Sequence, residues 1–298
     1  MPENKSPRTI TPDGPPPNPD PRKAAITLPP GSCDAHCHIY GPFSRFPLPE
    51  DRSFTPNEAP ETELRRLHEH FGFDRAVIVQ SQGHGFDHQP VRDALAVGGG
   101  RYRGVALVQP GTSAEEVASL DAAGFCGVRF SFMAHLGGYP DLSSVRSVID
   151  LVRPHDWHIA IHGAGQAIVE MTNFIRSIEA RVVIDHMARP DLADGPEGAA
   201  VTELRRLLDT GKVWVKLSGA DRLSKDGAPY RDAVPIARSL ADHAPERVLW
   251  GSDWPHVNLH GPMSDDASLV DLIAEIAPSE TTRRRLLVDN PAEFFRFQ

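Results

Sequence analysis

The sequence has few cysteines, no long apolar run and no excess of positive charge, and each shortage excludes a class of protein. The three cysteines are odd in number and lie in apolar runs, so we expect reduced, buried thiols in a cytoplasmic protein. No run of about 18 apolar residues occurs, and no basic start precedes an apolar stretch, so we expect neither a membrane span nor a secretory signal. The net charge of -9, without a stripe of lysine and arginine, argues against a nucleic-acid partner and favours a small molecule.

Residues 1–30 are rich in proline and poor in large apolar side chains, and they contain ten of the 28 prolines. Such a segment buries too little apolar surface to offset the entropy lost on ordering, so we expect a flexible or polyproline-like arm. An arm that binds a partner through PxxP motifs is the less favoured alternative to a plain surface tail. Residues 31–298 are then expected to form a single domain.

From residue 33 onward, short β-branched runs alternate with helical patterns. Strands are expected near 33–39, 75–80, 104–108, 126–132, 157–162, 181–186, 213–218 and 247–252. Helices are expected near 58–71, 90–97, 113–123, 142–154, 166–178, 199–210, 230–243, 266–276 and 280–287. Eight strands that alternate with helices predict a (β/α)8 TIM barrel, and 298 residues suffice for one. No GxGxxG motif follows the first strand, which disfavours an open doubly wound sheet.

Chemically active residues collect where the expected strands end. His36 and His38 lie two apart on the first strand, so their side chains point the same way and can converge on one object. His162, His186 and Asp253 lie at the ends of the fifth, sixth and eighth strands, and the active sites of TIM barrels form at these ends. Four imidazoles and one carboxylate could hold a divalent transition metal such as zinc.

Two further aspartates flank these histidines. By strand alternation, Asp34 and Asp185 should point away from the cavity, as structural groups or as groups that orient the imidazoles. Residues 41–57 contain four prolines and should form a long loop that can cover the catalytic face.

The motifs as a set resemble the amidohydrolase superfamily. They are the H-x-H at 36–38, His162, the D-H-M-x-R-P at 185–190 and the G-S-D-W-P-H at 251–256. Together with the G-V-R-F at 127–130, they are similar to its branch of 2-pyrone-4,6-dicarboxylate lactonases and 4-sulfomuconolactone hydrolases. The resemblance runs from about residue 31 to residue 291. It implies a hydrolase that opens a small anionic lactone in the bacterial breakdown of aromatic compounds.

Three departures from the pyrone lactonase pattern bear on the pocket. His162 stands where that pattern has a tyrosine, His135 replaces a basic residue after the fourth strand, and Phe54 replaces a tyrosine that contacts substrate. The lost phenol and guanidinium contacts favour the sulfomuconolactone type over the pyrone type. His162 restores a metal ligand of the wider superfamily, so the resemblance implies one zinc or similar ion, with a metal-free site as the alternative. No lysine occurs on the fourth strand to bridge two metals.

The ligands implied for that ion are His36, His38, His162, His186 and Asp253. Asp253 is the expected general base for a water that attacks the lactone carbonyl, and His186 is expected to hydrogen-bond the water or stabilise the tetrahedral intermediate. Planar guanidinium groups suit a carboxylate or sulfonate. The expected substrate contacts are Arg129, Arg189, Arg222, His135, Phe54 and His256.

Other activities remain open at this point. The same barrel could serve a metal-dependent decarboxylase or a lactone isomerase, and a non-enzymatic lactone or sugar-acid binding protein is less favoured. Binding alone does not need five converging acid and base groups. The sequence does not distinguish a monomer from a homo-oligomer.

Overall fold

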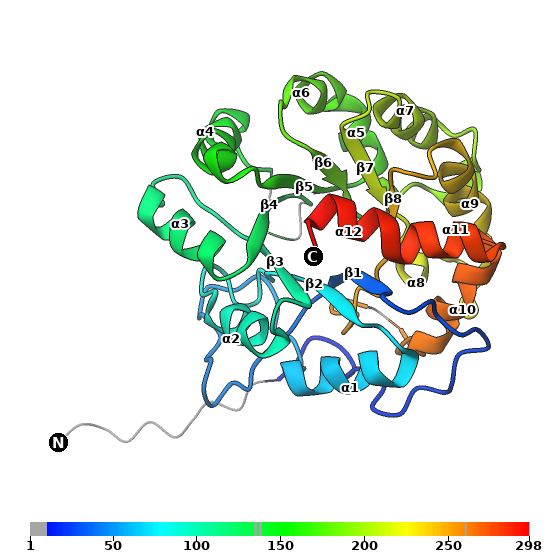
Figure 1. The fold of residues 1–298 in the computed structure, drawn as a ribbon, viewed down its shortest axis with the longest axis horizontal. Helices are drawn as coiled ribbons and strands as arrows, with labels where there is room; N and C mark the ends of the chain where they lie inside the picture. The colour runs from blue at the N-terminus through cyan, green and yellow to red at the C-terminus, as the bar shows by residue number, and fades with distance from the viewer. Residues whose placement is uncertain (1–10, 134–135, 137–138, 260, 298) are drawn as a thin grey trace.

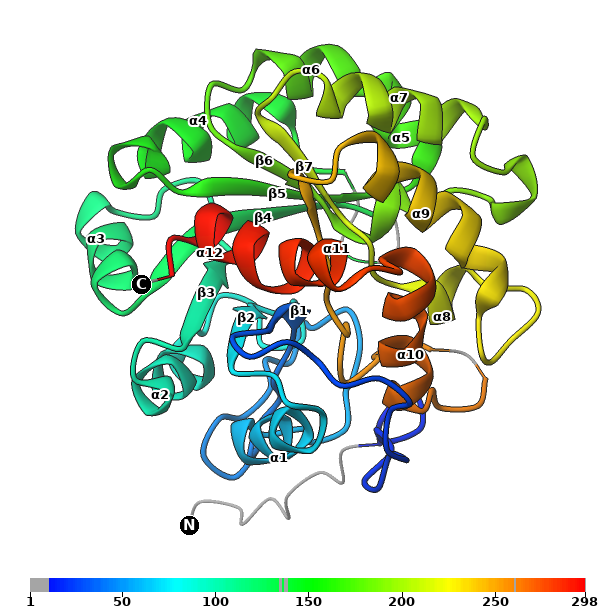
Figure 2. The same cartoon turned by 45° about the vertical axis from the view of Figure 1, so that its right-hand side comes forward.

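The chain folds into a (β/α)8 barrel in the computed structural model, which describes residues 11–133, 136, 139–259 and 261–297 (Figures 1 and 2). Eight parallel strands follow one another around the sheet in chain order. They are β1 (Cys33–Cys37), β2 (Arg75–Val79), β3 (Tyr102–Ala106), β4 (Phe125–Phe132), β5 (His158–Gly163), β6 (Val182–Ile184), β7 (Val213–Lys216) and β8 (Val248–Leu249). Main-chain hydrogen bonds from Ala35 to Trp250 (2.9 Å) and from His38 to Trp254 (2.8 Å) join the end of β8 to β1 and close the barrel.

Helices lie between the strands and cover the outside of the barrel. The first six are α1 (Glu61–Phe71), α2 (Gln89–Gly98), α3 (Ala114–Ala122), α4 (Leu142–Val152), α5 (Gly165–Glu170) and α6 (Thr172–Ser177). The others are α7 (Ala199–Leu208), α8 (Ala220–Leu223), α9 (Val234–His243), α10 (Asp266–Ile276), α11 (Glu280–Arg284) and α12 (Asn290–Phe295). The expected helix at 166–178 is two helices, because the chain leaves helical geometry at Met171.

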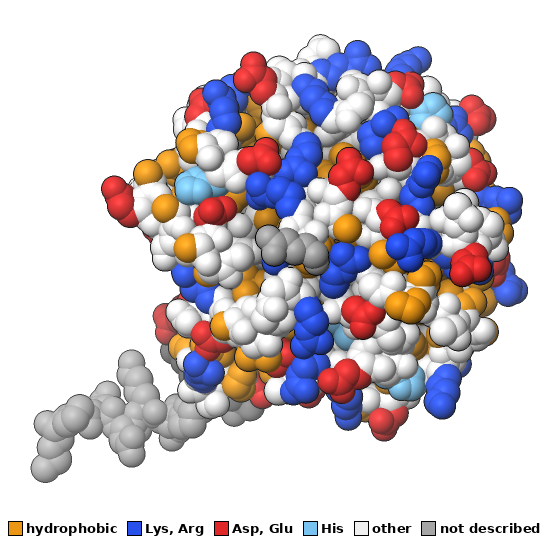
Figure 3. Space-filling model, in the orientation of Figure 1, with side chains coloured by type: hydrophobic (Ala, Val, Ile, Leu, Met, Phe, Trp, Pro, Cys, Tyr) orange, Lys and Arg blue, Asp and Glu red, His pale blue; other side chains and the backbone are white. Residues whose placement is uncertain are grey.

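The apolar side chains pack in two places. The larger core lies between the strands and the surrounding helices, and a smaller one fills the barrel interior. Phe294 and Phe295 of α12 belong to the smaller core, together with Cys33 at the start of β1. Helix α12 therefore plugs the end of the barrel at which the strands begin, and it crosses the front of Figure 1. On this face basic and acidic side chains are interspersed (Figure 3). Helix α12 does not cover the opposite end of the barrel, where the strands end, so a functional site can form there.

Glycine at position 251 allows β8 to approach β1 closely. A Cβ there would lie 2.5 Å from the main-chain nitrogen of His36, which is well inside van der Waals contact. The approach brings the end of β8 beside the paired histidines. A side chain at position 251 would therefore disturb the place where the two motifs meet.

The proline-rich N-terminal segment lies against the barrel over its described part. Asp13 and Thr55 exchange hydrogen bonds, since each main-chain N–H donates to an oxygen of the other residue (2.9 and 2.6 Å). Arg22 forms an ion pair with Asp271 (2.7 Å), and Leu28 is buried. Residues 11–30 therefore contact the barrel, and these polar contacts help to offset their ordering entropy. Residues 1–10 lie outside the described residues. Across the described chain, no helix has the length and apolar character required to cross a membrane.

Candidate active site

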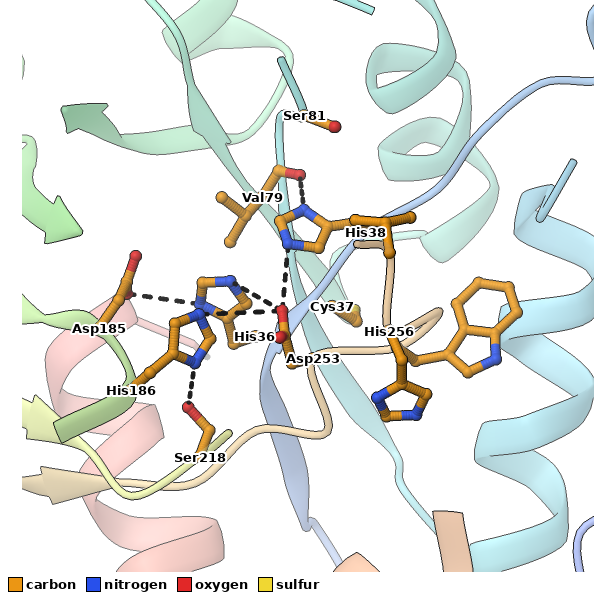
Figure 4. Close-up of polar contacts among 12 residues, drawn as sticks. His36, Cys37, His38, Val79, Ser81, Asp185, His186, Ser218, Asp253 and His256 are labelled. Atoms are coloured by element: carbon orange, nitrogen blue, oxygen red, sulfur yellow. Dashed lines mark hydrogen bonds and ion pairs between the residues drawn. The ribbon is translucent and has the colours of Figure 1, made fainter. Parts of the chain in front are cut away.

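The paired histidines of β1 meet Asp253 at the carboxyl end of the barrel (Figure 4). Nε2 of His38 lies 3.3 Å from Oδ1 of Asp253, and Nε2 of His36 lies 3.6 Å from the same atom. His186, which follows β6, approaches it at 3.8 Å through Nε2. Residues from both ends of the chain therefore converge on one carboxylate oxygen.

Asp253 is held as a carboxylate by the groups around it. Burial acts to raise its pKa, but Arg222, His186 and His38 outweigh burial and hold the pKa well below its usual range. Nε of Arg222 donates to Oδ2 at 2.5 Å, so Oδ1 is the oxygen that faces the histidines. Asp253 has a φ of 60°, a left-handed conformation that is costly for a non-glycine residue. The turn after β8 thus presents one charged oxygen to the cavity.

The chain makes a left-handed turn directly after β6. His186, Met187, Ala188 and Arg189 have φ values between 46° and 58°, although none is glycine. Because β6 ends at Ile184, strand alternation no longer determines where Asp185 points. Backbone strain of this kind persists only where surrounding contacts fix it, and it clusters at functional sites.

The expectation that Asp185 points away from the cavity is therefore wrong. Its Oδ1 lies 3.4 Å from Nδ1 of His36, and its Oδ2 accepts a hydrogen bond from Nε of Arg129 at 2.8 Å. Asp34 does face the other way, where it accepts hydrogen bonds from Ser252 and lies 3.2 Å from Nε2 of His68. The two aspartates thus act on different sides of the strands.

Lys216 is a site residue that the sequence reasoning missed. It is the last residue of β7 and is fully buried, with Nζ 2.9 Å from Nδ1 of His36 and 3.2 Å from Oδ1 of Asp185. Burial lowers the pKa of Lys216, while Asp185 opposes that shift. A metal-bridging lysine is expected on the fourth strand alone, whereas Lys216 ends the seventh. A charged residue at the end of the apolar run Val-Trp-Val was the signal that could have found it.

Three imidazoles of the site, those of His36, His162 and His186, have lowered pKa values and are neutral at pH 7. Burial, followed by the positive charge of Lys216, lowers the pKa of His36 well below its usual value. Burial and Arg129 do the same for His162, and burial lowers the pKa of His186 to about 4. Neutral imidazoles can accept a proton or bind a metal ion.

The donor set at Asp253 fits a divalent metal ion. The donor atoms of His36, His38 and Asp253 lie within 4.8 Å of one another, and those of His36, Asp185 and His186 form an overlapping group. Nδ1 of His38 lies 2.8 Å from the carbonyl oxygen of Val79, which can only accept, so Nδ1 carries the proton. The other ring nitrogen of His38, Nε2, faces the Asp253 carboxylate at 3.3 Å. A cation between the two would satisfy both groups.

His162 lies in the same cavity but in neither of these ligand groups. Its ring centroid is 5.4 Å from that of His186, and its Nδ1 is 3.5 Å from the hydroxyl of Ser131. A ligand role for His162 remains a prediction.

The site opens into a pocket of about 60 Å³. The pocket is lined by His38, Tyr40, Phe54, Ser81, Gln82, Arg129, Leu136, His162, His186, Arg189, Arg222, Asp253, Val257 and Asn258. Arg222 also donates to the carbonyl oxygen of Val257 at 2.7 Å, so its guanidinium is engaged with the protein on two sides. Arg189 is partly exposed, and its guanidinium has no hydrogen-bond partner among the described residues. Of the expected clamps, Arg189 is thus the one most available to an anion.

The remaining expected substrate contacts have different outcomes. Phe54 lines the pocket. His256 does not, because its ring is buried between Asp221 (3.1 Å) and Asp266 (3.0 Å), and in Figure 4 it is turned away from Asp253. We therefore correct the expectation that His256 contacts substrate. His135 lies outside the described residues.

Comparison with known proteins gives the family. A family model described as amidohydrolase matches residues 33–297. The chain belongs to the amidohydrolase family. This amidohydrolase is 38% identical to a 2-pyrone-4,6-dicarboxylate hydrolase of Comamonas testosteroni, over 93% of each chain. It is 36% identical to a 4-sulfomuconolactone hydrolase of Hydrogenophaga intermedia, over 91% of this chain and 90% of that protein. It is also 32% identical to a D-galactarolactone isomerase of Agrobacterium fabrum, over 90% and 92%.

Proposed function

We propose that this amidohydrolase opens a small anionic lactone, of the 4-sulfomuconolactone or pyrone-dicarboxylate type, in the bacterial breakdown of aromatic compounds in the cytoplasm. The observation that carries the proposal is the Asp253 carboxylate, which is held charged by Arg222 and has the imidazoles of His38 and His186 at 3.3 and 3.8 Å. The names of two relatives, both hydrolases of anionic lactones, support it.

In this proposal Asp253 is the general base. A water in the pocket gives its proton to Oδ1 while its oxygen attacks the lactone carbonyl carbon. The ring C–O bond then breaks, and the proton passes from Asp253 to the leaving alkoxide oxygen. Because Oδ2 is engaged by Arg222, only Oδ1 is placed for both transfers.

His186 is oriented for this reaction by the neighbouring strand. Its Nδ1 lies 2.9 Å from the hydroxyl of Ser218, and its Nε2 points at the Asp253 carboxylate. In this position it hydrogen-bonds the attacking water or the tetrahedral intermediate. Arg189 and Arg129 lie at the pocket wall, where they bind the carboxylate or sulfonate of the substrate.

The fit of the donor set extends the proposal to one divalent ion, most consistent with zinc, held by His36, His38 and Asp253. Such an ion supplies Lewis-acid polarisation of the lactone carbonyl. Elemental analysis of the purified protein should find about one zinc per chain, and His38→Ala should reduce that content. Zinc bound equally well by the His38 variant would contradict this ligand set.

Lactone hydrolysis is tested by measuring the protons released per turnover. Hydrolysis of a carboxymethyl butenolide releases one proton per turnover, which a pH-stat measures, and mass spectrometry should find a product heavier by one water. Asp253→Asn should abolish turnover, while Asp20→Asn, at a distant exposed position, should not.

One relative is a lactone isomerase, so isomerisation is the second candidate. An isomer formed without proton release would favour it over hydrolysis. Release of carbon dioxide would instead assign a decarboxylase, and recovery of unchanged lactone would leave only binding.

A further inference from the structure

A second and larger cavity adjoins the catalytic pocket on the same face of the barrel. It has a volume of about 770 Å³ and is lined by residues 47–53 after β1, 84–87 after β2 and 107–110 after β3. Volumes of about 300 to 1,000 Å³ are typical of pockets that bind small molecules. The catalytic pocket, at about 60 Å³, has room for only about four to six waters, since each needs about 10–15 Å³. A lactone with side groups must therefore extend beyond the catalytic pocket.

The two cavities share a wall. Gln82, Arg129 and Leu136 line both of them, and Nε2 of Gln82 donates to the carbonyl oxygen of Leu136 at 2.9 Å. The second cavity therefore lies directly beside the catalytic pocket, and the Gln82–Leu136 contact lies at their boundary.

The chemistry of the second cavity differs from that of the first. Its deep wall is apolar, and is built from Leu107 and Val108 after β3, Phe130 of β4, and Val145 and Val148 of α4. Phe86 and Tyr139 stand at the cavity with 51% and 64% of their surface exposed, so two large aromatic rings face solvent at one place.

The charged groups of the second cavity disfavour an anion. Glu50, Asp51 and Asp87 line it, and besides the shared Arg129 the cation there is Arg52. Nε and one terminal nitrogen of Arg52 donate to Thr55 and Pro49, which are close along the chain. A carboxylate or sulfonate is thus better placed at Arg189, and an uncharged apolar group is better placed here.

We propose that this second cavity binds an apolar substituent of the substrate, so that the preferred substrate is an anionic lactone that carries an aryl or alkyl group. The inference rests on the proposed function for the position of the lactone ring, but it adds a specificity that the carboxylate and the histidines do not supply. Burial of one aromatic ring should favour the substituted lactone by about tenfold or more.

Binding tests the inference separately from catalysis. The affinities of two carboxymethyl butenolides, one unsubstituted and one with a phenyl group on the ring, are measured by calorimetry on the Asp253→Asn variant. We expect the phenyl compound to bind about tenfold tighter. Val148→Phe, which adds bulk to the apolar wall of the cavity, should reduce this preference, and Phe86→Ser should reduce it as well. Val97→Ser is the matched control, because Val97 is 59% exposed on α2 and does not line the cavity.

The binding results test the second cavity, and the hydrolysis result tests the proposed function. Equal binding of the two lactones, or a phenyl preference that survives both Val148→Phe and Phe86→Ser, would overturn the subsite. Hydrolysis of the unsubstituted lactone by the unchanged protein tests the proposed function by itself. Loss of self-association in Phe86→Ser, with lactone preference unchanged, would assign the cavity to a contact with a second copy and would also overturn the proposal. Phe86 is exposed, so this variant should fold even if Val148→Phe does not.

Discussion

Replacing Arg222 with glutamine should change the pH dependence of catalysis more than the affinity for substrate. Its guanidinium donates to Oδ2 of Asp253 and to the carbonyl oxygen of Val257, and it helps hold the pKa of Asp253 well below the usual range. Without that charge, burial dominates and the pKa of Asp253 rises, since burial is the largest influence on it. Asp253, the proposed general base, then becomes protonated at a higher pH, so the acid limb of kcat/KM moves upward.

The expected loss of kcat/KM follows from the hydrogen bond that Arg222 donates to the charged Asp253 carboxylate. A hydrogen bond to a charged group contributes about 1.5–3 kcal/mol, and about 1.4 kcal/mol corresponds to tenfold. We therefore expect kcat/KM at pH 7 to fall by about 10- to 100-fold, carried mainly by kcat. Removal of one partner of a buried ion pair also costs about 3–5 kcal/mol of stability, so the variant is assayed well below its unfolding temperature.

The assay is a pH profile of kcat and KM for the unsubstituted butenolide, measured on the unchanged protein and on Arg222→Gln and Arg222→Lys. Lysine keeps a positive charge, so it should restore part of the profile. A variant that raises KM alone, with kcat and the acid limb unchanged, would refute this reasoning. Arg222 would then be the substrate clamp that the sequence suggested.

Three further changes test other parts of the site. Arg189→Ala should raise KM by about 10- to 100-fold with kcat and stability little changed, because its guanidinium has no hydrogen-bond partner among the described residues; an unchanged KM would remove it from the pocket. Asp266 and Asp221 outweigh burial and raise the pKa of His256 to about 10, so its contribution to stability is complete below about pH 6.5 and lost as the pH rises through about 10. Denaturant unfolding should therefore show a stability gap between the protein and His256→Gln that narrows from pH 7 to 10, and a constant gap would contradict the assignment. Asp13→Ala should raise KM several-fold, because Asp13 binds Thr55 beside Phe54 of the pocket; Asp13→Asn should restore it and Asp20→Ala should have no effect.

The strand and helix rhythm was predictable from the sequence because local periodicity sets it. The expected run at 75–80 became β2 and that at 126–132 became β4, with ends shifted by one residue. The convergence of His36 and His38 with Asp253 followed from the rule that strand ends share one face of a barrel. These inferences needed only spacing along the chain and the topology of the fold.

The errors arose where contacts between distant segments decide the geometry. His256 looked like a loop residue available to substrate, yet Asp221 after β7 and Asp266 at the start of α10 enclose its ring. Lys216 looked like an ordinary strand end, yet it contacts His36, which is 180 residues away in the chain. Local periodicity does not identify the partner in such pairings, because the two residues lie far apart in the chain.

The turn after β6 shows how neighbouring strands together build the site. Left-handed conformations at His186 and the next three residues cost of order 1–3 kcal/mol each, so local preference alone would not produce them. The chain after β7 packs against this turn: the hydroxyl of Ser218 meets Nδ1 of His186, and a Cβ at Gly219 would lie 3.2 Å from the His186 Cβ. Ser218 and Gly219 thus fix where His186 points, and through it one face of the Asp253 carboxylate. The position of the His186 imidazole after β6 is therefore encoded in part by Ser218 and Gly219, which lie shortly after β7.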